Sequence, residues 1–257
     1  MELGLKGKVV VITGGTAGIG AACAIGFCRE GAAVAVCGRT QKRIEAFNQE
    51  CHAAGVTVFA AQADAGNIEE LQRFADEVLG QYGHIDIWIN NAGINIGKKL
   101  MDITLSDWEK MVRVNLTGVL FGTQIAARAM GEKGGVILNA SSYASLVPSV
   151  GGTMYGATKA AVTNMTKTMA AELAPQHIRV NAYVPGVIDT PMNADRIAAD
   201  ITGSLIDAIA LHRVGSPEEM AKVLIFLASD AASYITGTTI EVSGGKYAVQ
   251  NSNVLWK

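Results

Sequence analysis

The chain from Lys8 to Glu30 has the sequence KVVVITGGTAGIGAACAIGFCRE. It begins with a short β-branched run, Lys8–Ile12, which is typical of a buried strand. A glycine-rich turn follows at Thr13–Gly20, and an apolar helical segment then extends to about Glu30. Glycines permit tight turns and let backbone N–H groups approach a diphosphate, and the N-terminus of the following helix favours negative charge. The segment therefore predicts a strand, a turn and a helix that together bind a dinucleotide.

The same segment is apolar enough to resemble a signal peptide or a membrane span. Lys6 and Lys8 precede Val9–Cys28, a 20-residue run whose only polar members are Thr13 and Thr16. Five glycines interrupt this run, and four of them fall within seven positions. Because such a cluster breaks a continuous helix, we expect neither export nor membrane anchoring.

The rest of the chain continues to alternate between strand and helix. Further strand patterns occur at Ala33–Cys37, Val56–Ala61, Ile85–Ile89, Gly135–Ala140, Ile178–Val184 and Thr239–Val242. Helical patterns lie between them, and this alternation predicts a parallel α/β sheet with helices on both faces. No linker, repeat or low-complexity tract is found, so we expect one domain over residues 1–257.

Two of the helix starts have capping sequences. Ser106-Asp107-Trp108-Glu109 has the composition of a capping box and predicts a long helix to about Met130, with Asn115 in its interior. Ser216-Pro217-Glu218-Glu219 combines a cap, a first-turn proline and acidic residues, and it predicts another helix start. An amide inside a helix is mildly unfavourable unless something uses it, which singles out Asn115.

Composition limits the partners. The chain has 257 residues, is 49% hydrophobic, and carries a net charge of −2 without blocks of like charge. Nucleic acid and anionic membranes are therefore not expected as partners. The spacing of the four cysteines, Cys23, Cys28, Cys37 and Cys51, indicates neither a disulfide framework nor a metal site. A reduced, cytoplasmic location fits best.

Candidate catalytic groups lie in Asn139–Lys159, NASSYASLVPSVGGTMYGATK. Tyr155 and Lys159 are four residues apart, so on a helix they share one face. A free tyrosine has a pKa of about 10, and an ammonium within roughly 4–6 Å lowers that pKa. The pair therefore predicts a general acid/base, and Ser142 is placed to hydrogen-bond a carbonyl oxygen from the other side.

The residues after the second strand bear on cofactor choice. Gly38-Arg39-Thr40 begins where dinucleotide folds contact the adenosine ribose, and an NAD site usually has Asp or Glu there. Glycine and arginine suit a 2′-phosphate instead, so NADP(H) is favoured over NAD(H). Asp64 closes the third strand, where it can approach the adenine. Asn90-Asn91-Ala92-Gly93 follows the fourth strand, at the sheet edge where ligands bind.

Taken together, these motifs resemble the short-chain dehydrogenase/reductase family along nearly the whole chain. The resemblance implies a Rossmann-like, doubly wound parallel sheet of about seven strands and a nicotinamide cofactor. It also implies a homotetramer, or a dimer, built on the helices that contain Asn115 and Tyr155. The motifs occur in family order: Thr13-Gly14 with Gly18-Ile19-Gly20, Asn90–Gly93, Asn115, Ser142 with Tyr155 and Lys159, and Pro185-Gly186 with Thr190.

The resemblance also implies a role for each matching residue. Tyr155 exchanges a proton with the substrate oxygen, Ser142 orients and polarises that oxygen, and Lys159 lowers the pKa of Tyr155 and holds the nicotinamide ribose. Asn115 positions a water that relays protons. The expected cofactor contacts are Gly14, Thr16, Gly18, Ile19, Gly20, Arg39, Thr40, Asp64, Asn91, Gly93, Tyr155, Lys159, Pro185, Gly186, Ile188 and Thr190.

Substrate contacts are expected from Ser142, Tyr143, Tyr155 and Met192, under a lid at residues 188–214. Neighbours of the motifs predict an apolar pocket, which suits a hydroxysteroid-like or other cyclic or aryl ketone or secondary alcohol. Lys98 and Lys99 are candidates to contact an anionic tail at its rim, although they also fit a solvated loop. The predicted lining is Ile94, Tyr143, Leu146, Val150, Met154, Tyr183, Val187, Met192, Leu205 and Ile206.

Several alternatives stay open. One is a 3-oxoacyl-[acyl-carrier-protein] reductase, although Gln176 stands where those enzymes typically carry an arginine that docks the carrier. Ala17 likewise replaces the basic residue that many NADP-preferring members have, which leaves Arg39 most of the phosphate recognition, with help from Lys42 or Arg43. A sugar or polyol dehydrogenase, another reaction on the same scaffold, and a non-catalytic dinucleotide-binding regulator are further alternatives.

Overall fold

The computed structural model describes residues 3–200, 202–246 and 248–256. Its centre is a seven-stranded sheet in the order β3-β2-β1-β4-β5-β6-β7, in which every pairing is parallel. This confirms the predicted fold class. The strands are β1 (Val9–Thr13), β2 (Ala33–Gly38), β3 (Phe59–Gln62), β4 (Ile87–Asn90), β5 (Gly135–Ala140), β6 (Ile178–Pro185) and β7 (Thr239–Val242).

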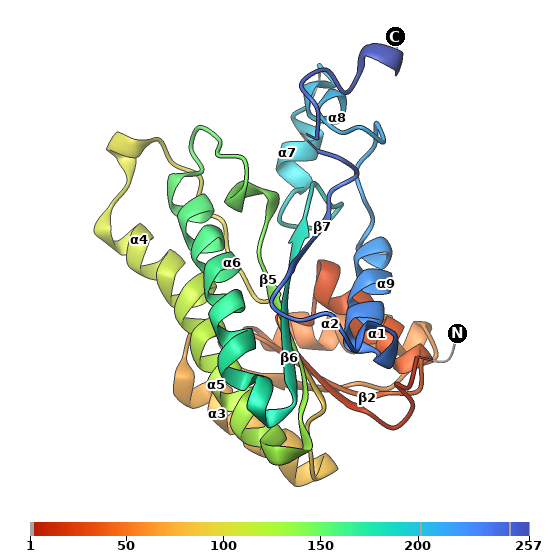
Figure 1. The fold of residues 1–257 in the computed structure, drawn as a ribbon. Helices are drawn as coiled ribbons and strands as arrows, with labels where there is room; N and C mark the ends of the chain where they lie inside the picture. Colours follow the sequence, from red (N-terminus) through yellow and green to blue (C-terminus); the bar gives the residue numbers. More distant parts are fainter. Residues whose placement is uncertain (1–2, 201, 247, 257) are drawn as a thin grey trace.

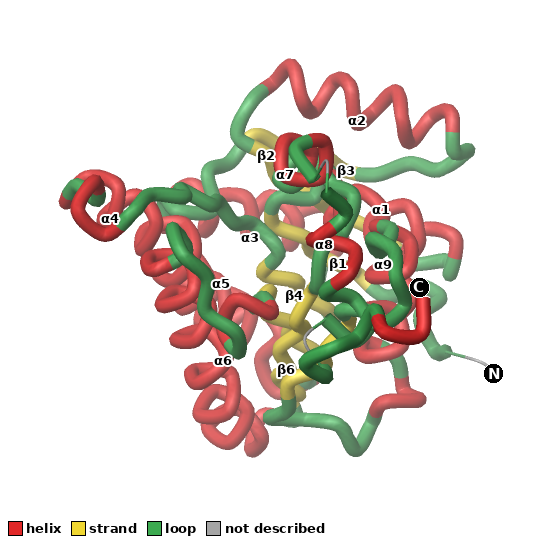
Figure 2. The backbone as a smooth tube through the Cα atoms, turned by 90° about the horizontal axis from the view of Figure 1, so that it is seen from above, coloured by secondary structure: helices red, strands yellow, loops and turns green. Residues whose placement is uncertain are grey.

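Helices cover both faces of the sheet (Figures 1 and 2). One layer holds α1 (Gly18–Arg29), α2 (Gln41–Ala53) and α9 (Pro217–Ala228), and the other holds α3 (Ile68–Tyr82), α5 (Gly118–Met130) and α6 (Thr153–Leu173). Successive side chains of β1 point to opposite faces of the sheet and pack against the two helix layers alternately. Val10 and Ile12 belong to one core cluster, whereas Val9 and Val11 belong to the other.

The strand order places the site. The chain runs outward from β1 through β2 to β3 and then returns to form β4 on the other side of β1. The connections after β1 and β4 therefore leave the sheet in opposite directions, and a crevice opens between their carboxyl ends. The apolar run Val9–Cys28 is divided among β1, the glycine turn and α1, as predicted. No helix in the described ranges is long and apolar enough to cross a bilayer.

The expected helix from Ser106 to Met130 differs from the structure in two ways. α4 (Leu105–Val112) is capped by Thr104, not by Ser106: Thr104 Oγ1 accepts from Asp107 N at 3.2 Å, and Asp107 Oδ2 accepts from Thr104 N at 3.0 Å. The Ser106 capping box is therefore wrong by two residues, because Thr104 and Asp107 satisfy the same pattern one half-turn earlier. A π-helical turn, Arg113–Thr117, then separates α4 from α5.

Other boundaries are closer to the prediction. The cap at Ser216 and Glu219 is confirmed, with both reciprocal bonds formed. β3 begins at Phe59, three residues later than expected, because Ala35 of β2 pairs with Phe59 as the first rung of their ladder. The predicted lid at 188–214 contains two short helices, α7 (Ala194–Ala198) and α8 (Ser204–Asp207), and its residue Ile201 lies outside the described residues.

Candidate active site

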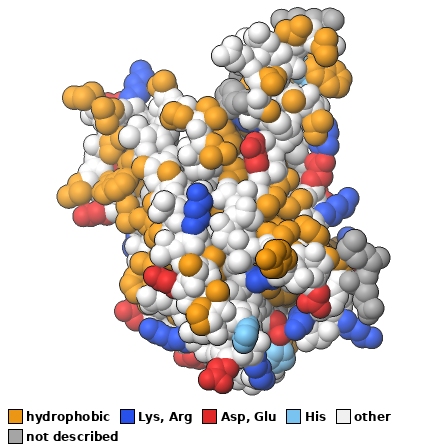
Figure 3. All heavy atoms as spheres, in the orientation of Figure 1, with side chains coloured by type: hydrophobic (Ala, Val, Ile, Leu, Met, Phe, Trp, Pro, Cys, Tyr) orange, Lys and Arg blue, Asp and Glu red, His pale blue; other side chains and the backbone are white. Residues whose placement is uncertain are grey.

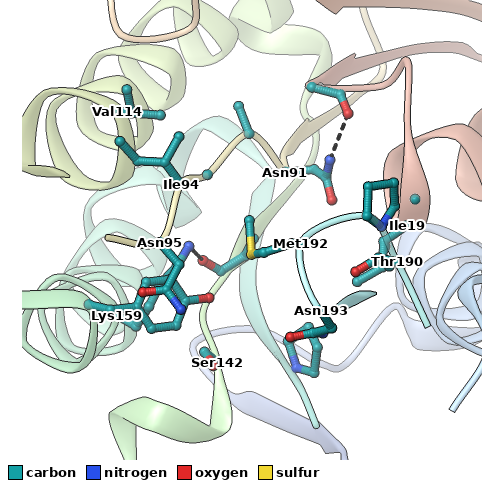
Figure 4. Close-up of a pocket in the computed structure, with 18 of the residues that line it drawn as sticks. Ile19, Asn91, Ile94, Asn95, Val114, Ser142, Lys159, Thr190, Met192 and Asn193 are labelled. Atoms are coloured by element: carbon teal, nitrogen blue, oxygen red, sulfur yellow. Dashed lines mark hydrogen bonds between the residues drawn. The ribbon is translucent and has the colours of Figure 1, made fainter. Parts of the chain in front are cut away.

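A cavity of about 840 Å³ opens at the carboxyl ends of the central strands (Figure 4). Its lining brings together most of the residues that the sequence singled out, from segments far apart in the chain. Only two of the predicted cofactor and catalytic residues, Gly20 and Asn115, do not line it. The predicted residues that do are Gly14, Thr16, Gly18, Ile19, Arg39, Thr40, Asp64, Asn91, Gly93, Ser142, Tyr143, Tyr155, Lys159, Pro185, Gly186, Ile188, Thr190 and Met192.

The glycine positions of the turn leave no room for a side chain. Gly14 has φ +64°, and a Cβ there would lie 2.9 Å from Ala92 Cα; Gly18 has φ +52°, and its Cβ would lie 3.0 Å from Thr190 Cγ2. Gly20 lies beneath the turn, where a Cβ would come within 2.5 Å of Gly14 O. The turn therefore presents bare backbone at the start of α1, which fits a diphosphate. Gly20 does not line the cavity, but its missing side chain lets α1 pack closely beneath the turn.

Asn91 joins the glycine turn to the end of β4. Its Nδ2 donates to Thr13 O and Gly14 O, both at 3.1 Å, and its Oδ1 accepts from Tyr183 Oη at 3.1 Å. Figure 4 shows one of the bonds that the Asn91 amide donates. Thr13 Oγ1 in turn accepts from the backbone N–H groups of Asn91 and Ala92, both at 3.1 Å. The sequence missed these roles of Thr13 and Tyr183, although both stand at the carboxyl ends of predicted strands.

The end of the cavity near β2 is cationic. Arg39 is exposed and lines the cavity together with Arg43, whereas Lys42 does not. Gly38 is buried, and a Cβ there would lie 2.7 Å from Thr16 Oγ1. These features fit a 2′-phosphate, because the guanidinium groups are accessible and no carboxylate occupies position 38 or 39.

Asp64 lies at the same end but is already engaged. Its Oδ2 accepts from Arg113 Nη1 at 2.9 Å, and its Oδ1 accepts from Gly66 N at 3.0 Å. Burial by itself raises the pKa of Asp64, but the Gly66 N–H and the Arg113 guanidinium outweigh it and hold the pKa below its ordinary value. Asp64 is therefore a carboxylate tied to the π turn, and its expected approach to an adenine stays a prediction.

Tyr155 and Lys159 share one face of α6, next to Ser142. The Lys159 side chain is buried, and its Nζ lies 5.7 Å from the Tyr155 ring centroid and donates to Ala140 O at 2.8 Å. Burial lowers the pKa of Lys159 from 10.5 to about 8. Burial also raises the pKa of Tyr155, while a hydrogen bond with Ser142 acts in the opposite direction. The expected lowering of the Tyr155 pKa is therefore not found, because burial of the phenol has the larger effect.

Asn115 is completely buried in the π turn. Its Oδ1 accepts from Ile94 N at 2.8 Å, and its Nδ2 donates to Ile94 O at 2.9 Å and to Thr158 Oγ1 at 3.3 Å. The amide therefore clamps the segment after Gly93 to α6. This use explains an amide inside a helix, and the expected water-positioning role stays a prediction.

The substrate end of the cavity is only partly as predicted. Ile94, Tyr143, Val150, Tyr183 and Met192 line it, and Met192 reaches between Asn95 and Thr190 (Figure 4). The other five predicted lining residues do not. Leu146 points to solvent and Met154 is buried on α6; Ile206 lies outside the lining, and Val187 and Leu205 pack with Ile209 in a small cluster of their own.

Polar residues that the sequence analysis missed share this end. Asn95, Asn193 and Arg196 line the cavity, and Arg196 has no motif that would have revealed it. Of the two rim lysines, Lys98 Nζ lies 2.6 Å from Asp107 Oδ2, so its charge is already paired. Its expected contact with an anionic tail is therefore not supported, whereas Lys99 lines the cavity with no ion pair to the described residues.

Comparisons with known proteins agree with this geometry. The sequence model of the family described as "Enoyl-(Acyl carrier protein) reductase" matches residues 14–246. The 3-oxoacyl-[acyl-carrier-protein] reductase FabG of Aquifex aeolicus is 39% identical over 96% of this chain and 100% of its own. The 3beta-hydroxysteroid dehydrogenase 1 of Eggerthella lenta is 39% identical over 94% of each. A short-chain type dehydrogenase/reductase from Mycobacterium marinum is 34% identical over 95% of this chain and 97% of its own, with a TM-score of 0.89.

The chain is therefore a nicotinamide-dependent oxidoreductase with a Rossmann-like sheet. It belongs to the short-chain dehydrogenase/reductase family.

Proposed function

We propose that the protein is an NADPH-dependent reductase that acts on the keto group of a 3-oxoacyl thioester. The observation that carries the proposal is the grouping of Ser142, Tyr155 and Lys159 beside a bare glycine turn and two accessible arginines. Similarity to 3-oxoacyl-[acyl-carrier-protein] reductases supports the substrate class. This ranks the thioester above the hydroxysteroid-like ketone that the apolar residues alone favoured.

The cofactor proposal follows from the shape and charge of the cavity. Gly14, Thr16, Gly18 and Ile19 would hold the diphosphate at the start of α1, and Arg39 with Thr40 would hold the 2′-phosphate. Pro185, Gly186, Ile188 and Thr190 also line the cavity, as do Asn91 and Gly93. When bound, the nicotinamide supplies the hydride that reduces the carbonyl carbon.

The side chains of this protein would manage the proton. A raised pKa keeps the Tyr155 hydroxyl protonated, so it is ready to donate to the carbonyl oxygen as negative charge develops there. Ser142 would hydrogen-bond the same oxygen and hold it beside Tyr155. The Lys159 ammonium would stabilise the phenolate that remains, and Asn115 would fix the wall of the site through its bonds to Ile94.

A second candidate function is the reduction of an apolar cyclic ketone. Two observations favour it: the similarity to a 3beta-hydroxysteroid dehydrogenase and the presence of Gln176 where an arginine is typical of carrier-dependent reductases. Apolar side chains of Val150 and Met192 at the cavity are compatible with either substrate. A sugar or polyol ranks below both.

The test is a set of initial rates with NADPH and NADH, followed by the absorbance of the reduced nicotinamide. The substrates are a 3-oxoacyl thioester of N-acetylcysteamine, a 3-oxosteroid and a small keto sugar. We expect the thioester with NADPH to give the highest kcat/KM. Faster turnover of the steroid would establish the second candidate, and faster turnover of the sugar would refute the proposal.

We also propose a homotetramer, with a dimer as the alternative, in the cytoplasm. An open groove of about 540 Å³ between α5 and α6 is lined by Leu120, Ala127 and Met169 together with polar residues such as Gln124 and Glu172. Apolar side chains also gather over α4 and the turn before it, where Leu100, Met101 and Leu105 are exposed (Figure 3). Such surfaces favour association between subunits. The four free cysteines fit a reducing compartment.

A further inference from the structure

Tyr143 lies between two cations at the substrate end of the cavity. Arg196 Nη1 donates to Tyr143 Oη, and Arg196 Cζ lies 5.9 Å from the centroid of the Tyr143 ring. Lys246 Nζ lies 5.5 Å from the same centroid. An aromatic face attracts a cation at this range. Three separate segments, the turn after β5, the lid helix α7 and the turn after β7, thus meet at one ring.

The glycines after β7 place Lys246. Gly244 and Gly245 have φ of +65° and +75°, and the backbone N–H of Lys246 donates to Ser243 Oγ at 3.1 Å. This turn carries the lysine side chain to the Tyr143 ring, where it is buried and does not itself line the cavity. Tyr143 follows Ser142 directly, and Tyr143 acts electrostatically on Tyr155. Of the two cations, Arg196 therefore lines the same cavity as Ser142 and Tyr155.

Arg196 brings its positive charge to the cavity wall. Arg196 and Asp200 both act electrostatically on the buried Lys246 at the same ring. Arg196 forms no ion pair with the parts of the chain that the structure describes. Arginine offers five N–H donors, of which the Tyr143 hydroxyl engages one. A guanidinium so placed at a cavity matches the geometry of a carboxylate or a phosphate.

We propose that Arg196, held in place by Tyr143 and supported by the charge of the buried Lys246 at the same ring, forms a subsite for an anionic group of the substrate. The inference rests on the proposed carbonyl reductase activity and names what its substrate carries. The anionic group has two possible sources: a carboxylate on the body of an oxo acid, or a phosphate on the coenzyme arm of a thioester. Lys98 does not serve this purpose, because its charge is paired with Asp107, and the cation that would contact the anionic group is Arg196.

The test compares two matched pairs of ketones at saturating NADPH. One pair is an apolar oxo acid and its neutral amide, and the other is a 3-oxoacyl coenzyme A thioester and the N-acetylcysteamine thioester of the same acyl group. We expect the wild type to prefer the anionic member of at least one pair. Arg196→Gln should lower kcat/KM for that member about 10- to 100-fold while leaving its neutral partner unchanged. Lys246→Gln should give a loss in the same direction.

Three further variants sharpen the test. Arg196→Lys keeps the charge but not the planar fork, so it should retain part of the preference. Lys222→Gln removes an exposed lysine of α9 and should behave as the wild type. Lys99→Ala removes a cavity-lining lysine that forms no ion pair with the described residues, and loss of the preference in that variant would overturn the proposal. Circular dichroism and thermal melting show whether each variant is folded.

The outcomes separate the subsite from the activity on which it rests. A selective loss in the coenzyme A pair identifies a phosphate as the anionic group, and a selective loss in the oxo acid pair identifies a carboxylate. Equal turnover of both members by the wild type, or equal losses for both members in Arg196→Gln, refutes the subsite alone. If the wild type reduces no neutral ketone or thioester, the proposed activity itself fails.

Discussion

Lys159→Met should change how the stability of the protein depends on pH. Only 2% of the Lys159 surface is exposed, and burial lowers its pKa from 10.5 to about 8. A difference of this size between the folded and unfolded chains corresponds to about 3 kcal/mol of unfolding free energy. Because the pKa is lower in the folded state, the unfolded chain binds the proton more tightly between about pH 8 and 10.5.

The cost of burying the Lys159 ammonium decreases as the pH rises. At about pH 7 the wild type bears the full cost of burying an ammonium, and this cost disappears as the pH rises from about 8 to 10.5. Methionine has no such group. The unfolding free energy of the wild type minus that of Lys159→Met should therefore increase by about 3 kcal/mol over this range. The contribution of Lys246 cancels, because both proteins contain it.

The measurement is urea denaturation at a fixed protein concentration, followed by tryptophan fluorescence at several pH values. Lys167→Met, an exposed position on the same helix, is the matched control for replacing lysine by methionine. Wild-type and Lys159→Met curves that stay parallel from about pH 7 to 10.5 would show that Lys159 is not desolvated. That result would also remove the basis for treating it as a buried cation beside Tyr155.

Three other predictions concern activity, cofactor and assembly. Tyr155→Phe should lose about 10²- to 10⁴-fold in kcat while still binding NADPH in a fluorescence titration, because only the proton-transfer group is removed; unchanged turnover would contradict the mechanism. Arg39→Ala should raise the KM for NADPH about tenfold or more and affect the KM for NADH far less, since a charge-assisted bond to phosphate is lost. Equal increases for both cofactors would show that Arg39 does not recognise the 2′-phosphate. Light scattering at micromolar concentration should give four times the mass of one chain, and a monomer would refute the proposed association.

Local sequence patterns predicted the sheet and its cofactor turn. The β-branched run, the clustered glycines and the apolar helix each specify backbone conformation within a few residues, and β1, the turn and α1 form where expected. Parallel strands joined by helices can be ordered in few ways, which made the fold class predictable before the strand order was known. Asn91 was found because it follows a buried strand at the sheet edge where ligands bind.

The features that were missed depend on contacts between distant segments. The cap of α4 is an exception, because Thr104 and Asp107 form a local capping box that the sequence also contains. The place of Arg196 depends on the short helix α7, whose pattern is too brief to be recognised in a sequence. The wrong direction for the Tyr155 pKa has the same origin, because spacing along a helix cannot show how deeply the folded chain buries the phenol.

Burial acts on the two proposed proton-handling groups in a consistent way. It raises the pKa of Tyr155 and lowers that of Lys159, so each is pushed toward its neutral form. A neutral phenol is a proton donor, and donation is what the reduction of a carbonyl requires. The phenolate that results would make the Lys159 ammonium more favourable, since opposite charges stabilise each other strongly where water is excluded. The environment of Tyr155 and Lys159 thus favours carbonyl reduction, in agreement with the reductases that this chain resembles.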